Sequence, residues 1–278
     1  MPLFSRNVQL LPPLRISSWR KIAIGTWKTA KDPSVYGVLE LDVGPALKYI
    51  DTLREKTGLK ITLSHFMGVA VARTLHRHPD INCILRFGKL YPRKDVDVFF
   101  QVASGEGGKE LSGLTIRNAG QKTITEVARE MQEAVTVIRD KGDPAFRKSK
   151  KMMTSTPGIL VGLLLDVLGF ILYGLNIWSP LLGSPKDPFG SVMVTNIGPL
   201  GLDFAFAPLV AYSRVPLLMA LGAARETPVV RNGALAIAKI CNVCVTFDHR
   251  LIDGAHASQM VKTLVKTFAE PESIERLG

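Results

Sequence analysis

The sequence predicts a mixed α/β fold of the α+β kind, in which one mixed sheet is covered by helices. Strands and helices are expected to alternate along the chain. Residues 228–238 favour an antiparallel hairpin, because Asn232 and Gly233 supply the positive φ angles of a type I′ turn. Of the 278 residues, 46% are hydrophobic and 21% are charged, so the chain can bury a sizeable core.

The first half of the chain is predicted to hold an arm, a strand and two helices. Residues 1–18 carry three prolines among apolar residues and are expected to form an extended arm. Residues 19–278 are expected to form the domain itself. Alternating apolar residues predict a strand at 35–42, and helices at 45–56 and 64–78 are each delimited by a proline.

The second half continues the alternation. Residues 95–103 are typical of a strand, and the sequence T-I-T-E at 123–126 is a capping box that opens an amphipathic helix. After the hairpin, the outgoing strand can run to Phe247. Gly254 is expected to break the chain there, before a last helix at 255–270.

Charge and cysteine content limit the classes of partner and compartment. A formal net charge of +11 favours a polyanionic partner, which could be nucleic acid, an anionic membrane or a phosphorylated cofactor. The basic residues are scattered and are not interleaved with aromatic ones, so no nucleic-acid groove is expected. Three cysteines cannot form a disulfide framework and no secretory leader is recognisable, so a cytoplasmic location is expected.

Two groups of side chains resemble metal ligands only superficially. Cys241 and Cys244 lie three positions apart on a predicted strand, where such residues point to opposite faces. His76, His78 and Asp80 fall where a helix is predicted to end, a place where the helix dipole favours cations. No metal site is therefore expected.

The run D-H-R-L-I-D-G at 248–254 carries the candidate chemistry. It is predicted to lie between a strand end and a helix start, where side chains are held by the scaffold but still reach solvent. The pattern H-x-x-x-D-G resembles the signature of the chloramphenicol acetyltransferase-like superfamily. The fuller pattern D-H-R-x-x-D-G resembles the acyltransferase catalytic domain of the 2-oxoacid dehydrogenase complexes.

Further segments carry the same resemblance, which extends from about Trp19 to Ile274. They are R-K-I-A at 20–23, H-P-D-I-N at 78–82, I-R-N-A at 116–119, V-T-N-I-G at 194–198, A-P at 207–208 and L-G at 221–222.

The resemblance implies an enzyme that moves an acyl group between coenzyme A and a thiol. Such a transfer needs a base for the S–H proton and a donor for the oxyanion of the tetrahedral intermediate. By the resemblance, His249 is the base, and Thr195 stands where the family has an oxyanion-donating serine on the neighbouring subunit of a trimer. Asp253 occupies the acidic position of the motif and is the third candidate catalytic residue, although an architectural ion pair with Arg20 is the favoured role. The supporting positions of these motifs are Asn196, Arg250 and Gly254.

Residues 143–188 are longer than the family's connector and form an apolar insertion. Residues 147–151 are basic, and residues 158–178 are nearly long enough to span a bilayer, which takes ~20 apolar residues. A single span would place His249 and the strand that carries Arg117 on opposite sides of the membrane. We expect burial against the chain's own or a neighbouring trimer first, interfacial membrane contact second and a span last.

Two hypotheses of function follow. In the complexes the catalytic domain is tethered to lipoyl domains, and too few residues precede Arg20 to form one, so a lipoyl group is expected in trans. The first hypothesis is a coenzyme-A-dependent acyltransferase. The second is a catalytically weak or inactive scaffold homologue that forms an oligomeric shell and binds coenzyme A, motivated by the missing lipoyl module and by threonine at 195. A cage of trimers is compatible but not implied, because residues 275–278 lack an apolar tail.

Overall fold

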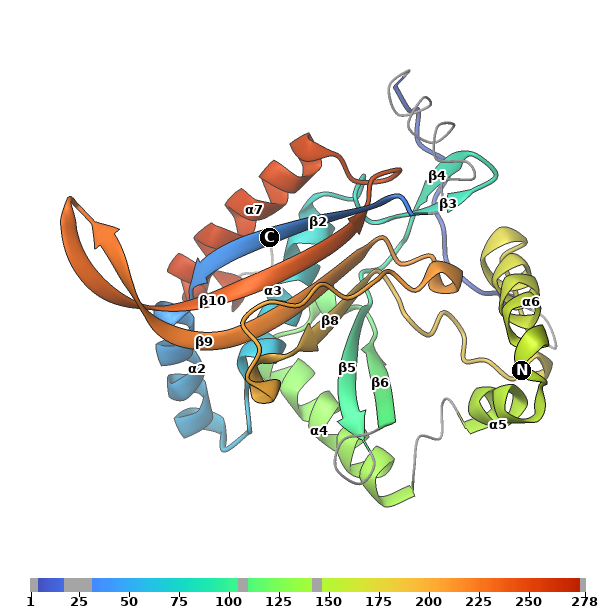
Figure 1. The fold of residues 1–278 in the computed structure, drawn as a ribbon, viewed down its shortest axis with the longest axis horizontal. Helices are drawn as coiled ribbons and strands as arrows, with labels where there is room; N and C mark the ends of the chain where they lie inside the picture. The colour runs from blue at the N-terminus through green and yellow to red at the C-terminus, as the bar shows by residue number, and fades with distance from the viewer. Residues whose placement is uncertain (1–4, 18–31, 105–109, 142–146, 276–278) are drawn as a thin grey trace.

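The computed structural model describes residues 5–17, 32–104, 110–141 and 147–275. At its centre lies one six-stranded sheet with the strand order β2-β10-β9-β8-β5-β6 (Figure 1). The pairs β5–β8 and β8–β9 are parallel and the other pairs are antiparallel, so the predicted mixed sheet is confirmed. Its strands are β2 (Ser34–Asp42), β5 (Val98–Ser104), β6 (Glu110–Ile116), β8 (Val192–Asn196), β9 (Leu217–Arg231) and β10 (Ala234–Asp248).

The main helices cover one face of this sheet and form the principal core with it (Figure 1). Phe66 of α3 and Phe268 of α7 meet edge to face there, with ring centroids 4.8 Å apart. Gly68 allows α3 to approach β5, since a Cβ at this position would lie 2.1 Å from the ring of Phe100. The helices are α2 (Gly44–Thr57), α3 (Leu63–Arg77), α4 (Ile124–Lys141) and α7 (Gly254–Ala269), with short 3-10 turns η2 (Ala119–Gln121), η5 (Gly198–Leu200), η6 (Ala211–Ser213) and η7 (Pro271–Glu275).

Local signals in the sequence form the structures that they predict. The N–H of Thr123 donates to the carboxylate of Glu126 at 2.8 Å, and the N–H of Glu126 donates back to Thr123 Oγ1 at 3.2 Å. Asn232 and Gly233 have φ angles of 51° and 80° and connect β9 to β10. Both strands have 15 residues, so the hairpin is much longer than residues 228–238.

Two element boundaries differ from the prediction. Strand β5 begins at Val98 rather than at residue 95, because the N–H of Asp97 donates to the Ser191 hydroxyl and its carboxylate binds the loop after β6. Gly254 does not break the chain. It is the first residue of α7, since Asp253 caps that helix.

Helices α5 and α6 of the insertion lie at one side of the molecule in Figure 1. Strand β7 pairs antiparallel with β1 (Ser5–Arg6), near the start of the chain. Within the described parts of the chain, no helix is long and apolar enough to cross a membrane. The insertion consists of α5 (Arg147–Ser155), α6 (Gly158–Gly169), a π-helical turn η3 (Phe170–Gly174), β7 (Ile177–Trp178) and η4 (Pro180–Leu182), and the separate hairpin β3 (Cys83–Arg86) and β4 (Lys89–Pro92) lies nearby.

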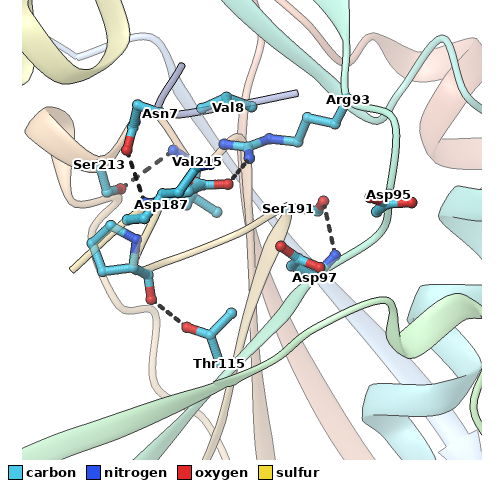
Figure 2. A network of polar contacts seen from close by, with 12 residues as sticks. Asn7, Val8, Arg93, Asp95, Asp97, Thr115, Asp187, Ser191, Ser213 and Val215 are labelled. Carbon is cyan, nitrogen blue, oxygen red and sulfur yellow. Dashed lines mark hydrogen bonds and ion pairs between the residues drawn. The ribbon is translucent and has the colours of Figure 1, made fainter. Parts of the chain in front are cut away.

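A buried polar network joins the start of the chain to the end of the insertion (Figure 2). The side chain of Asn7 accepts a hydrogen bond from the N–H of Asp187 at 2.9 Å and donates to the carbonyl of Leu172 at 2.9 Å. The guanidinium of Arg93 donates to the Asp187 carboxylate at 2.5 Å, and these two side chains are only 3% and 8% exposed. An ion pair so fully removed from water depends on both of its partners.

Substituting Asp187→Asn is expected to lower the free energy of unfolding by about 3 kcal/mol, because it leaves the buried Arg93 charge without its counterion. Asparagine also tolerates the positive φ of 41° at this position, so the variant tests charge and not backbone strain. The matched control is Asp203→Asn, whose partner Arg225 is 56% exposed, with an expected loss below about 1 kcal/mol. Urea unfolding measures both, and equal losses would contradict the account.

Candidate active site

His249 follows the last residue of β10, and hydrogen bonds hold both its backbone and its ring. Its backbone N–H donates to the carbonyl of Pro33 at 3.0 Å, and its ring Nδ1 lies 2.9 Å from the carbonyl oxygen of Ile252. A carbonyl oxygen can only accept, so Nδ1 carries the proton and Nε2 is the basic nitrogen of the ring. The side chain is half-buried. The turn therefore holds the imidazole as the tautomer whose lone pair is on Nε2, the nitrogen that would act if His249 is a general base.

The residues on either side of His249 stiffen this turn. The Asp248 carboxylate accepts from the N–H of Arg250 at 2.9 Å and from its guanidinium Nη2 at 2.7 Å. The carbonyl of Asp248 accepts from the N–H groups of Leu251 and Ile252. Arg250 thus binds within the motif and fixes the orientation of the chain that carries His249.

Asp253 forms the N-cap of α7. Its carboxylate accepts from the N–H groups of Ala255 at 3.0 Å and His256 at 3.1 Å, and it lies 2.9 Å from His256 Nδ1. A carboxylate at this position satisfies helix N–H groups and interacts favourably with the helix dipole. The expected partner Arg20 lies outside the described residues.

Thr195 lies on β8, on the face of the sheet opposite the helices. It pairs with Ala220 of β9, which pairs with Cys244 of β10, and both belong to the smaller core on that face. Its neighbour Asn196 points the other way, and its amide donates to the hydroxyl of Ser64 on α3 at 3.2 Å.

The register of the sheet separates Thr195 from His249 within one chain. Thr195 is level with Cys244, and His249 lies five positions further along the chain of β10. At ~3.3 Å per residue and ~4.8 Å per strand, the two residues are about 16 Å apart along the strands and about 10 Å apart across them. The structure therefore does not bring these two predicted site residues together.

A pocket of about 240 Å³ lies beside the His249 turn. Its walls are residues 32–34, 209–211 and 214–215 together with Leu85, Asp248, Arg250 and Leu251. Burial, and to a smaller extent the nearby Arg250, lowers the pKa of the Arg214 guanidinium in this wall. Sequence reasoning missed Arg214, since only its folding against the motif distinguishes it from the other arginines.

Among the described residues, no group of three histidine, cysteine or carboxylate side chains could hold a metal ion. Cys241 and Cys244 are free and buried, and they belong to the cores on opposite faces of the sheet, as predicted. Burial raises the pKa of the Cys241 thiol to about 11, so it is a protonated packing residue at neutral pH.

Comparison with known families decides the classification. Residues 14–143 and 188–275 match the family model of the 2-oxoacid dehydrogenases acyltransferase (catalytic domain). The chain belongs to this family. The two matched segments are separated by the residues that form α5, α6, η3 and β7.

Individual relatives of this acyltransferase-family chain agree. The lipoamide acyltransferase component of the branched-chain alpha-keto acid dehydrogenase complex of Bacillus subtilis is 22% identical over 93% of this chain and 53% of its own length. The chain thus spans about half the length of the curated relatives that it matches.

Solved structures confirm the predicted chloramphenicol acetyltransferase-like fold. A probable dihydrolipoamide acetyltransferase from Listeria monocytogenes has a TM-score of 0.65 at 17% identity, with 92% of this chain and 94% of that chain covered. The Azotobacter vinelandii dihydrolipoamide acetyltransferase, studied for the catalytic roles of a serine, a histidine and an asparagine, scores 0.64 at 21% identity over 95% and 99%. A chloramphenicol acetyltransferase scores 0.55 at 15% identity over 91% and 96%.

The capping role of Asp253 predicts a difference between two substitutions in this acyltransferase-family chain. Asp253→Ala is expected to lower the free energy of unfolding by about 1 kcal/mol, because two helix N–H groups lose their acceptor. Asp253→Asn keeps an acceptor oxygen, so it is expected to cost only a few tenths of a kcal/mol. Thermal unfolding checks both variants, and an equal loss for both would show that the carboxylate charge, and not the cap, is what matters.

Proposed function

We propose that this acyltransferase moves an acyl group between coenzyme A and a thiol acceptor of the dihydrolipoyl type, with His249 as the general base. The observation that carries the proposal is the 2.9 Å contact between Nδ1 of His249 and the carbonyl of Ile252. This contact fixes the proton on Nδ1 and so assigns basicity to Nε2. Family membership supplies the reaction class.

The proposed reaction balances around this nitrogen. Nε2 of His249 takes the proton of the attacking thiol, and the resulting thiolate adds to the carbonyl carbon of the acyl thioester. The Thr195 hydroxyl of another copy of the chain donates to the oxyanion that forms. Collapse of the intermediate breaks the bond to the departing thiolate, which takes the proton back from the imidazolium.

Thr195 differs from the family serine by one methyl group. Threonine keeps the donating hydroxyl but has a stiffer χ1 angle, so the space beside the oxyanion is narrower than with serine. In the Azotobacter vinelandii enzyme the histidine and asparagine studied for their catalytic roles are four positions apart, which is also the spacing of His249 and Asp253. Asp253 and Arg250 act here as positioning residues for the turn.

The proposed assembly is a homotrimer whose sites lie between copies. The sheet register keeps Thr195 and His249 of one chain apart, so a complete site needs a second copy. Large apolar side chains are also exposed on the face of β2 and on the β9–β10 hairpin, as expected of surface that another copy covers. These include Tyr36 (48% exposed), Val38 (46%), Leu235 (81%) and Ile237 (74%).

Two further parts of the proposal concern the acceptor and the location. A lipoyl group carried by another chain is the proposed physiological acceptor, and free dihydrolipoamide is its small-molecule substitute. The three cysteines are buried and form no disulfide, which is compatible with the reducing cytoplasm that the sequence favours. The net charge of +11 suits coenzyme A, which carries several phosphate charges.

Replacing His249 with alanine is expected to lower kcat/KM for acetyl transfer from acetyl-coenzyme A to dihydrolipoamide by about 10²–10⁴-fold, since the thiol loses its base. The matched control is His76→Ala, an exposed histidine at the end of α3, with unchanged kinetics expected. Wild-type rates for His249→Ala would refute the role of His249. Binding of coenzyme A by the wild-type protein without turnover of any thiol would instead favour the scaffold hypothesis, for which threonine at 195 is the motive.

A further inference from the structure

Helix α6 presents an apolar face to solvent. Ile159, Leu163, Val167 and Phe170 are 92%, 62%, 47% and 50% exposed, and their spacing of three to four residues places them on one side of the helix. We call these four residues the outer face of α6. Phe87, at the tip of the β3–β4 hairpin, extends the apolar surface. It is 68% exposed, and its ring meets that of Phe170 edge to face at 6.3 Å.

The opposite side of α6 packs against other residues of this chain. Leu168 and Gly169 are buried, and Gly169 faces the backbone of Tyr212 in η6. The helix is therefore anchored on the domain with its outer face directed away from it, which agrees with its position at the edge of the molecule in Figure 1. An exposed apolar stripe of this kind marks an interaction surface.

Positive charge accompanies the outer face. Helix α5 opens with four basic residues within 147–151, and no acidic residue occurs from 147 to 165. Lys148 and Lys151 are exposed. A second copy that presented the same surface would bring two basic α5 helices together, whereas anionic phospholipid head groups would complement their charge.

The dimensions of α6 suit the membrane surface. Twelve residues make a helix about 18 Å long, too short to cross a hydrocarbon core of about 30 Å but sufficient to lie along the head-group boundary. Asp166, exposed next to the outer face, favours this shallow position because a carboxylate is costly in the acyl region.

We propose that the outer face of α6, together with the basic helix α5, docks this protein peripherally on an anionic phospholipid surface. The outer face enters the head-group boundary, and Lys148 and Lys151 pair with lipid phosphates. Because α6 packs on η6, and Ala211 of η6 lines the pocket beside His249, docking brings the candidate active site close to the membrane.

Flotation of the full chain with vesicles provides the test. We expect the protein to float with vesicles of equal parts phosphatidylcholine and phosphatidylglycerol, and to stay unbound with phosphatidylcholine alone. Raising the salt from low to high concentration is expected to weaken the binding, since exposed charges are screened. Absence of binding to the anionic vesicles, or equal binding to both compositions, would overturn the proposal.

Variants identify the surface. Leu163→Asp is expected to abolish flotation, and Lys148→Ala with Lys151→Ala to weaken it by about tenfold or more. The matched control is Val265→Asp, an exposed valine of α7 (45%) outside this surface, which should bind as the wild type does. Wild-type flotation of Leu163→Asp contradicts the proposal. The proposal is also contradicted if the wild type does not bind vesicles and Leu163→Asp lowers the oligomeric mass. In that case a second copy of the chain covers the outer face.

Discussion

The antiparallel pairing of β9 with β10 is the constraint on which the rest of the structure depends. Along this ladder β10 carries the chain to Asp248, where the turn presents His249, while the other edge of β9 holds β8 and Thr195. One irregularity occurs, between Cys241 and Val243, beside Gly222, where a Cβ would lie 2.3 Å from the Asp203 carbonyl. The glycine of the L-G motif is therefore needed for close backbone packing.

Because this ladder is long, the separation of the two candidate catalytic groups, Thr195 and His249, is a rigid property of one protomer. No rotation of the Thr195 or His249 side chain can close a separation fixed by two strand pairings. If both groups act on one substrate, they must come from different copies of the chain. The proposed site between copies therefore rests on sheet register together with the chemistry of the reaction, and the family match supports the proposed reaction class.

Signals that act over a few residues were sufficient to predict much of the fold. The Asn232-Gly233 turn and the Thr123–Glu126 capping box form as the sequence predicts, and the histidine motif lies between a strand and a helix as expected. Each depends on local backbone geometry, which the residues themselves encode.

Long-range pairings were not predictable in the same way. The sequence indicates only the end of strand β6, at the segment that carries Arg117, and it does not predict the β3–β4 hairpin. Nothing local indicates that β1 pairs with β7 some 170 residues away. Arg214 reaches the pocket beside His249 only through the folding of the 209–215 loop. The tertiary context that determines such pairings is absent from sequence periodicity.

The insertion shows what the sequence predicts and what it does not predict. Its composition predicts an apolar segment that must be covered by another surface. In the structure, one side of this segment is buried and the other is exposed. The inner side packs on η6 and is attached to the start of the chain through the Asn7 and Asp187 network, while the outer face of α6 stays exposed. The sequence alone does not distinguish the buried side from the exposed side, because Leu168 and Val167 are both apolar.

Mixing two inactive variants tests the central claim most directly. His249→Ala and Thr195→Ala, each purified alone, are dissociated, combined in equal amounts and reassembled, and acetyl transfer to dihydrolipoamide is then measured. If each site takes His249 from one copy and Thr195 from the next, random assembly restores about a quarter of the wild-type sites. Activity no greater than the mean of the separate variants, in particles shown by native mass spectrometry to contain both chains, would contradict a site shared between copies.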